Sequence, residues 1–132
     1  MEHPRMFDED DPLLARVRTI CLRLPEAEEG VSFGRPWFRT RTAFAVYGGG
    51  TKGPGKLAYP RSVLLLPDAD TRLALLEDER CFVPAYFGPK GWMGVDLTAG
   101  EPDWDWLAEL IDESYRNTAP KRLVAALDAA RS

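Results

Sequence analysis

Histidine, cysteine and long apolar runs are scarce in this chain of 132 residues. His3 is the only histidine, and Cys21 and Cys81 stand alone, without a CxxC pair or a neighbouring histidine. Such a sequence offers little for histidine-based catalysis or for a zinc site. No apolar run approaches the roughly 18 residues that a membrane-spanning helix needs. We therefore expect a protein that is not an enzyme, holds no metal or cofactor, and has no membrane partner.

The amino-terminal residues are acidic and lack the apolar segment of a secretory signal. Both cysteines fall in apolar patterns, which are more typical of core positions than of redox or metal sites. These features favour a cytoplasmic protein. The length fits one domain, so we predict an acidic arm over residues 1–11 and a single domain over residues 12–132.

Hydrophobic spacing and turn residues predict helices in four places: 12–24, 68–76, 103–115 and 119–130. Strands are predicted over 36–41, 43–47, 56–66, 82–86 and 92–97, the third of them interrupted at Pro60. Asp11 and Thr118 are the expected N-caps of the first and last helices. This order of elements predicts an α+β fold, a single compact domain whose antiparallel sheet has helices packed on one face.

Residues 30–67 contain no carboxylate, although the whole chain is net acidic with a formal charge of −4. The basic side chains of this segment are Arg35, Arg39, Arg41, Lys52, Lys56 and Arg61. Aromatic residues are interleaved with them: Phe33, Trp37, Phe38, Phe44, Tyr47 and Tyr59. Positive charge beside exposed rings is typical of a surface that binds phosphates and bases, or another anionic ligand. The alternative is that the arginines are solvated strand positions without a ligand.

A glycine-rich stretch in the same segment, Gly50–Lys56, fits the GxxxxGK pattern of phosphate-binding loops. In such loops a Ser or Thr follows the lysine and a helix begins there. Here Leu57 follows and leads into a predicted strand. We therefore interpret the stretch as a flexible hairpin loop whose two lysines, Lys52 and Lys56, are available to phosphates.

Two tryptophans lie beside basic residues. Trp37 falls between Arg35 and Arg39, and Trp92 follows Lys90 and a glycine at the start of a predicted strand. Each ring is either a platform on which a base stacks or a cover for the end of the core.

Several short motifs resemble the MmcQ/YjbR family in their order and spacing: Leu24-Pro25, Phe33-Gly34-x-Pro36-x-Phe38-Arg39, Phe44-Ala45, Pro84-x-Tyr86, Gly91-Trp92, Glu113-Ser114-Tyr115 and Lys121-Arg122. The resemblance covers residues 12–127 approximately. It implies a double-wing fold similar to frataxin-like domains, and a DNA-binding label that rests on structural analogy. It also implies that Arg41 and Lys90 occupy basic positions of the family.

We therefore predict a non-catalytic module that binds DNA or another nucleic acid weakly and in a salt-dependent way. Its predicted binding residues are Arg35, Arg39, Arg41, Lys52, Lys56, Arg61, Lys90, Trp37 and Trp92. One alternative is a resistance-type protein that binds a small planar or anionic compound in an aromatic pocket near Trp37, Tyr86 and Trp92. Another is a protein-interaction subunit, because Trp104 and Trp106 are two apart on one predicted helix and one of them is expected to be partly exposed.

Overall fold

The computed structural model describes residues 5–132, so His3 and the start of the predicted acidic arm lie outside the described residues. The helices are α1 (Pro12–Leu22), α2 (Ala69–Leu76), α3 (Trp104–Thr118) and α4 (Lys121–Arg131), with a short 3₁₀ turn, η1 (Gly88–Lys90). The strands are β1 (Glu28–Ser32), β2 (Arg35–Arg39), β3 (Ala43–Gly50), β4 (Ala58–Leu65), β5 (Cys81–Phe82) and β6 (Met93–Asp96). Within this described range, no helix is both long and apolar enough to cross a membrane.

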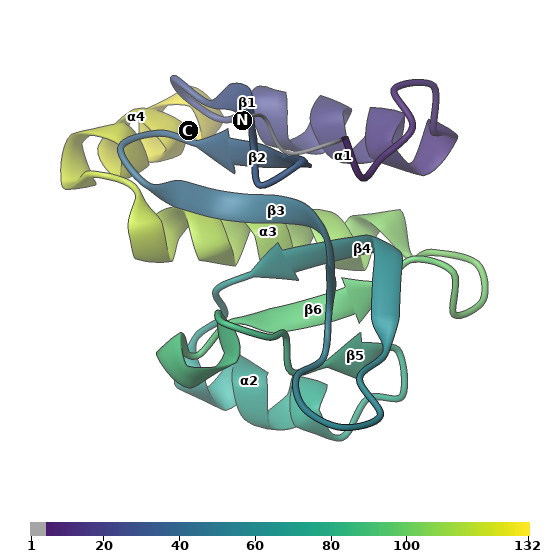
Figure 1. The fold of residues 1–132 in the computed structure, drawn as a ribbon. Coiled ribbons are helices and arrows are strands. Elements are labelled where there is room, and N and C mark those ends of the chain that lie inside the picture. The colour runs from purple at the N-terminus through teal and green to yellow at the C-terminus, as the bar shows by residue number, and fades with distance from the viewer. Residues whose placement is uncertain (1–4) are drawn as a thin grey trace.

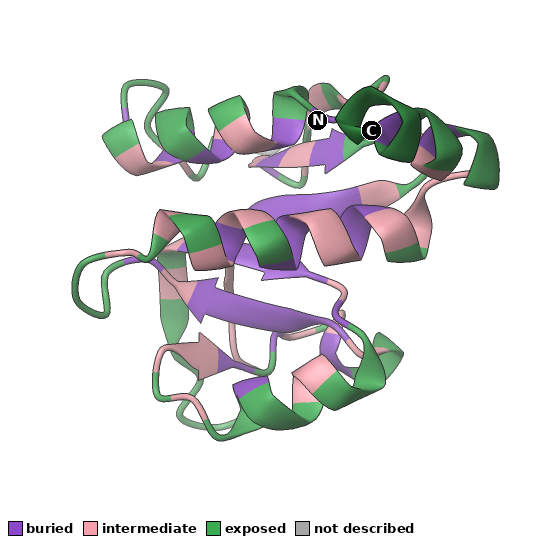
Figure 2. Cartoon of the chain, turned by 180° about the vertical axis from the view of Figure 1, so that it is seen from behind, coloured by how far each residue is buried: buried purple, intermediate pink, exposed green. Residues whose placement is uncertain are grey.

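The strands form one antiparallel sheet in the order β1-β2-β3-β4-β6-β5. Helices α1, α3 and α4 pack on one face of the sheet, and α3 runs across its middle strands (Figures 1 and 2). Helix α2 lies at the other end of the domain, beside β5 (Figure 1). The structure therefore confirms the predicted α+β domain with helices on one face of an antiparallel sheet.

The face beneath the helices holds the main core. Phe44 and Tyr115 are fully buried and meet edge to face, with ring centroids 5.3 Å apart. The buried hydroxyl of Ser114 donates to the Phe44 carbonyl at 2.6 Å and accepts from the Leu66 N–H at 2.8 Å. Because this hydroxyl both donates and accepts a hydrogen bond, it joins α3 to β3 and to the end of β4 without leaving a buried polar group unpaired.

The opposite face is covered by loops rather than by α-helices in the part of the chain that the structure describes (Figure 1). One row of paired positions crosses this face from β2 to β5: Trp37, Val46, Leu64, Gly94 and Phe82. The ring of Phe82 lies over Gly94, where a Cβ would come within 2.3 Å of it. This row builds a second, smaller apolar cluster.

The structure has one strand that the sequence does not predict and one strand that is longer than predicted. The sequence does not predict β1, because Glu28 and Glu29 suggest an acidic connection rather than a strand that pairs with β2. Strand β3, predicted to end at Tyr47, continues to Gly50, so Gly48, Gly49 and the first glycine of the predicted loop are strand residues.

Further differences concern a short strand, a proline and a helix cap. The strand predicted over 82–86 is reduced to β5, because only Cys81 and Phe82 pair with β6 and the chain then turns, with the Gly88 N–H donating to the Pro84 carbonyl at 2.8 Å.

Strand β4 continues through Pro60, and the ladder to β3 changes register between Tyr47 and Gly49, so the strand is bent rather than broken (Figure 1). Thr118 belongs to the end of α3, and Pro120 instead occupies the N-cap of α4.

Candidate anion-binding groove

A groove of about 1120 Å³ lies on the loop-covered face of the sheet. Its floor comes from β2, β3 and β4, through Trp37, Val46 and Leu64. The β3–β4 loop and the β5–β6 connection form its walls, and Phe33 from the β1–β2 turn lies at its rim. The smaller apolar cluster therefore supports a surface that faces solvent.

Backbone hydrogen bonds hold the walls in place. Thr51 and Leu57 close the base of the β3–β4 loop, because the Thr51 N–H donates to the Leu57 carbonyl at 2.9 Å and the Leu57 N–H donates to the Thr51 hydroxyl at 2.8 Å. The Ala85 N–H donates to the Gly50 carbonyl at 2.8 Å. This last bond joins the β5–β6 connection to the end of β3, so the two walls are tied together.

Among the described lining residues, Arg35 is the one basic side chain that is partly buried. Its guanidinium packs against Gly48 of β3, where a Cβ would lie 2.4 Å from Nη1. Gly48 has a φ of 91°, which glycine adopts without a steric penalty. Nη1 is buried and has no hydrogen-bond partner among residues 5–132. Burial lowers the pKa of Arg35, because removal from water penalises the charged form.

Three exposed lysines stand around the groove: Lys52, Lys56 and Lys90. The described residues that line the groove include no Asp or Glu. Neither Arg35 nor any of these lysines forms an ion pair with another described residue. Four unneutralised positive charges around one hollow create a local positive potential, which attracts an anionic ligand to a protein that is net acidic.

Aromatic rings continue from the floor of the groove to its rim. The Trp37 ring lies 5.7 Å from the Phe87 ring and 6.3 Å from the Phe33 ring, measured between centroids. At the rim, Phe33 is 65% exposed and Tyr86 is 86% exposed. Both residues have positive φ, 53° and 68°, a conformation that costs about 1 kcal/mol for a non-glycine residue and is concentrated at functional sites. The backbone thus presents two rings to solvent beside the basic residues.

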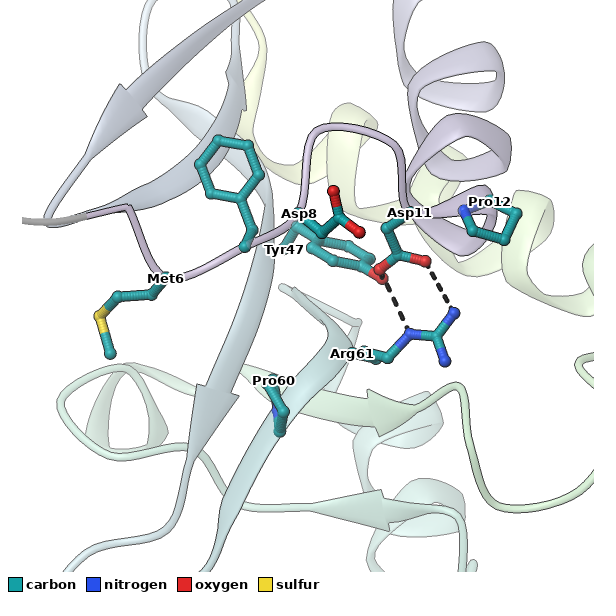
Figure 3. Close-up of a pocket in the computed structure, with 8 residues that line it drawn as sticks. Met6, Asp8, Asp11, Pro12, Tyr47, Pro60 and Arg61 are labelled. Atoms are coloured by element: carbon teal, nitrogen blue, oxygen red, sulfur yellow. Dashed lines mark hydrogen bonds and ion pairs between the residues drawn. The ribbon is translucent and has the colours of Figure 1, made fainter.

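A smaller hollow of about 610 Å³ lies between the amino-terminal segment and the bend of β4 (Figure 3). Two of its charged groups neutralise each other, because Nη2 of Arg61 donates to Asp11 Oδ1 at 2.7 Å, and the Tyr47 hydroxyl donates to Oδ2 of the same carboxylate at 2.5 Å. Asp11 also caps α1, as predicted, by accepting from the Leu13 N–H at 2.9 Å. Burial acts to raise the pKa of Asp11, but these hydrogen bonds outweigh it and hold the pKa below its usual value.

The structure brings together five of the nine predicted binding residues. Arg35, Trp37, Lys52, Lys56 and Lys90 all line the groove. They come from β2, from the β3–β4 loop and from η1. The glycine-rich stretch is a hairpin loop between two antiparallel strands, as predicted, and both of its lysines belong to the lining.

The other four predicted residues lie elsewhere. Arg39 is exposed at the far end of β2, with its guanidinium near Gly30 of β1, and Arg41 is in the β2–β3 turn. Arg61 is paired in the smaller hollow. Trp92 is only 7% exposed and lies beneath Phe87, with centroids 5.1 Å apart, so its ring supports the groove without facing a ligand.

The two tryptophans of α3 are both half-buried. Trp104 lies under the guanidinium of Arg16, 4.8 Å from its ring centroid, and Trp106 under that of Arg80 at 3.9 Å. Each ring therefore has a cation–π contact within the domain.

The nine predicted nucleic-acid-binding residues omit three aromatic residues of the groove, Phe33, Tyr86 and Phe87, of which Tyr86 is named only for the small-molecule alternative. The sequence carries a partial signal for them, because Phe33 precedes Gly34 and the other two precede Gly88-Pro89, and such turn residues place neighbouring side chains at loop tips. The role of Gly48 has no such signal, since its closeness to Arg35 arises only when β2 and β3 pair.

The fold and the groove define a small α+β protein with a basic, aromatic-lined groove on the loop-covered face of its sheet. The chain belongs to the YjbR family, whose model matches residues 22–117, as the resemblance predicts. The crystal structure of Deinococcus radiodurans protein DR2400, a DUF419 domain, is similar at 20% sequence identity with a TM-score of 0.57. The match covers 77% of this chain and 75% of that chain, and it shows the shared fold. No curated protein matches the sequence.

Proposed function

We propose that this protein is a non-catalytic module that binds single-stranded nucleic acid in the groove. The observation that carries the proposal concerns the described lining of the groove, which combines four cations that form no ion pair with another described residue with exposed aromatic rings, and which has no carboxylate. Cations that follow a phosphate backbone beside rings that stack on bases are the usual features of single-strand binding. A duplex suits this site less well, because its bases are stacked on one another and do not offer their faces to protein rings.

The composition of the lining also supports binding without catalysis. It contains no His, Cys, Asp or Glu among the described residues, and these are the side chains that most often transfer protons or attack substrates. The net charge of −4 opposes tight binding to a polyanion, so the affinity is weak and strongly dependent on salt. We place this activity in the cytoplasm, in line with the sequence-based expectation.

The salt dependence of binding tests this proposal. Four phosphate contacts on a single strand give a slope of log K against log salt of about −3, since each contact contributes about 0.7. We expect this slope for a fluorescein-labelled oligothymidylate in an anisotropy titration. The double substitution Lys52→Ala/Lys56→Ala should reduce the slope by about 1.4 and weaken binding at every salt concentration.

The matched control removes two exposed basic residues away from the groove. Arg23→Ala/Lys121→Ala changes the net charge by the same amount but alters no lining residue. We expect its slope to equal that of the wild type. Equal losses in the two double variants would mean that net charge alone governs binding, and a salt-independent affinity would contradict the proposal.

A further inference from the structure

Arg35 differs from the three groove lysines because its guanidinium is held by packing. Its Nη1 is so close to Gly48 that a Cβ there would leave 2.4 Å between the atoms, and the Pro60 carbonyl would lie 3.1 Å from the same Cβ. An exposed lysine loses side-chain freedom when it binds an anion, whereas a side chain already held in place loses less. Arg35 is therefore the cation best suited to fix an anionic group at one position.

Two polar groups of β2 lack partners at the groove floor. Nη1 of Arg35 and Nε1 of Trp37 are both buried, and neither has a hydrogen-bond partner in the described part of the chain. Because these residues are separated by one position on a strand, their side chains leave the same face. Buried donors without partners are uncommon and costly. Both donors are closed off from solvent, so an oxyanion seated against β2 would satisfy them by displacing the side chains that cover the groove floor.

The surroundings favour phosphate as that oxyanion. The planar guanidinium of arginine matches phosphate geometry with two parallel hydrogen bonds. Phe33 and Tyr86 lie at the rim of the same groove, and exposed rings stack on nucleobases. A volume of about 1120 Å³ slightly exceeds the range of about 300–1,000 Å³ for small-molecule sites, so the groove has room for a nucleotide.

We propose that Arg35 and Trp37 form a phosphate subsite at the groove floor, so that one nucleoside phosphate, with its base against Phe33 and Tyr86, is the minimal ligand. This inference rests on the proposed function and names the position within the groove that a phosphate occupies. A free nucleotide and one unit of a single strand present the same phosphate and base, so the experiment must separate these two sources.

The first test compares thymidine 5′-monophosphate with thymidine by isothermal titration calorimetry. We expect the wild type to bind the monophosphate at least tenfold more tightly than the nucleoside, because a charged hydrogen bond to phosphate is worth about one decade or more in affinity. Arg35→Gln should remove most of this difference while leaving thymidine binding unchanged. Lys121→Gln, on the exposed side of α4, should leave both affinities unchanged.

A pair of glycine variants tests whether the position of the guanidinium matters, without a change in charge. Gly48→Ala places a Cβ against Nη1 and should displace Arg35. Gly100→Ala is the matched control, because Gly100 has a similar φ of 88° and no atom of residues 5–132 lies within 4 Å of the position that a Cβ would take there. We expect only the first variant to lose the preference for the monophosphate. If Gly48→Ala does not fold, Arg35→Lys serves instead and should retain an intermediate preference.

The outcomes separate the subsite from the proposed function. Equal affinities for thymidine 5′-monophosphate and thymidine, or no binding of the monophosphate, would overturn the subsite. If oligothymidylate then still binds through Lys52 and Lys56, the proposed function stands without it. If the monophosphate binds through Arg35 but oligothymidylate competes no better, the subsite is supported, and the ligand is a free nucleotide rather than a strand.

Discussion

Arg35 and Arg61 belong to the same carboxylate-free segment, yet the fold gives them opposite surroundings. Arg61 lies in the smaller hollow, 2.7 Å from a carboxylate oxygen of Asp11. Arg35 lies in the groove and has no ion pair with any described residue. The hydrogen bond to Asp11 raises the pKa of Arg61, whereas burial lowers that of Arg35. Arg61 therefore forms an ion pair within the domain, whereas the charge of Arg35 is available to a ligand.

The difference arises from a carboxylate that lies outside the segment. Asp11 is 50 residues before Arg61 in the sequence and reaches it because the segment before α1 packs back on the sheet (Figure 3). The Met6 N–H donates to the Gly34 carbonyl at 2.8 Å, which holds the same segment on the β1–β2 turn. A local excess of basic residues in the sequence therefore does not show which of them lack an ion pair. That depends on which carboxylates the fold brings next to them.

We expect the largest loss of stability when Asp11, the ion-pair partner of Arg61, is replaced. Asp11→Ala deletes the α1 cap and leaves the buried Tyr47 hydroxyl and Arg61 without their acceptor. These losses should lower the free energy of unfolding by about 3 kcal/mol, measured by urea denaturation. Asp8→Ala, in the same segment but exposed, should change it by less than about 0.5 kcal/mol. Equal effects of the two substitutions would show that the contacts of Asp11 with Arg61 and Tyr47 do not stabilise the smaller hollow.

Substituting the two arginines should separate stability from binding. Arg61→Gln should cost about 1 kcal/mol of stability, since the side chain is 43% exposed and its ion pair is partly screened. It should leave oligothymidylate affinity nearly unchanged. Arg35→Gln should weaken oligothymidylate binding without lowering the free energy of unfolding, because it removes a partly buried charge that has no described partner. Both properties are measurable on the same samples by urea denaturation and anisotropy, and a shared loss of stability would contradict the assignment.

The smallest effect is a pH dependence. A carboxylate whose folded pKa is depressed stabilises the protein above its unfolded pKa of about 3.9, and this stabilisation is lost as pH falls through the folded pKa. The pKa of Asp11 is lowered, so the stability difference between wild type and Asp11→Asn should be constant near neutral pH. It should narrow below about pH 4, in urea denaturation series at several pH values. A difference that stays the same down to about pH 2 would show that the charge of Asp11 contributes little.

The helices could be predicted from the sequence because their signals are local. Asp11 and Asp103 cap α1 and α3 through side-chain bonds to nearby N–H groups, and apolar periodicity marks the buried faces. Strand β1 could not be predicted, because it lies at the edge of the sheet and its Glu29 is held by Arg18 of α1 at 2.8 Å. That contact depends on how distant elements pack.

The groove could be predicted only in part for the same reason. The run of basic residues located Arg35, Lys52 and Lys56, but nothing local separates them from Arg61. The left-handed conformations of Phe33 and Tyr86 depend on the turns that hold them, so their exposure follows from the fold.

The indole N–H signals of the four tryptophans offer the most direct test of where a ligand binds. Trp37 lies at the groove floor, whereas Trp104 and Trp106 belong to α3 on the other face of the sheet. In ¹H–¹⁵N spectra of the full chain titrated with oligothymidylate, the account predicts that the Trp37 indole signal shifts with ligand concentration and that those of Trp104 and Trp106 do not. Shifts at Trp104 or Trp106 without a shift at Trp37 would place the ligand on the helical face and contradict the account, as would a spectrum in which no indole signal moves.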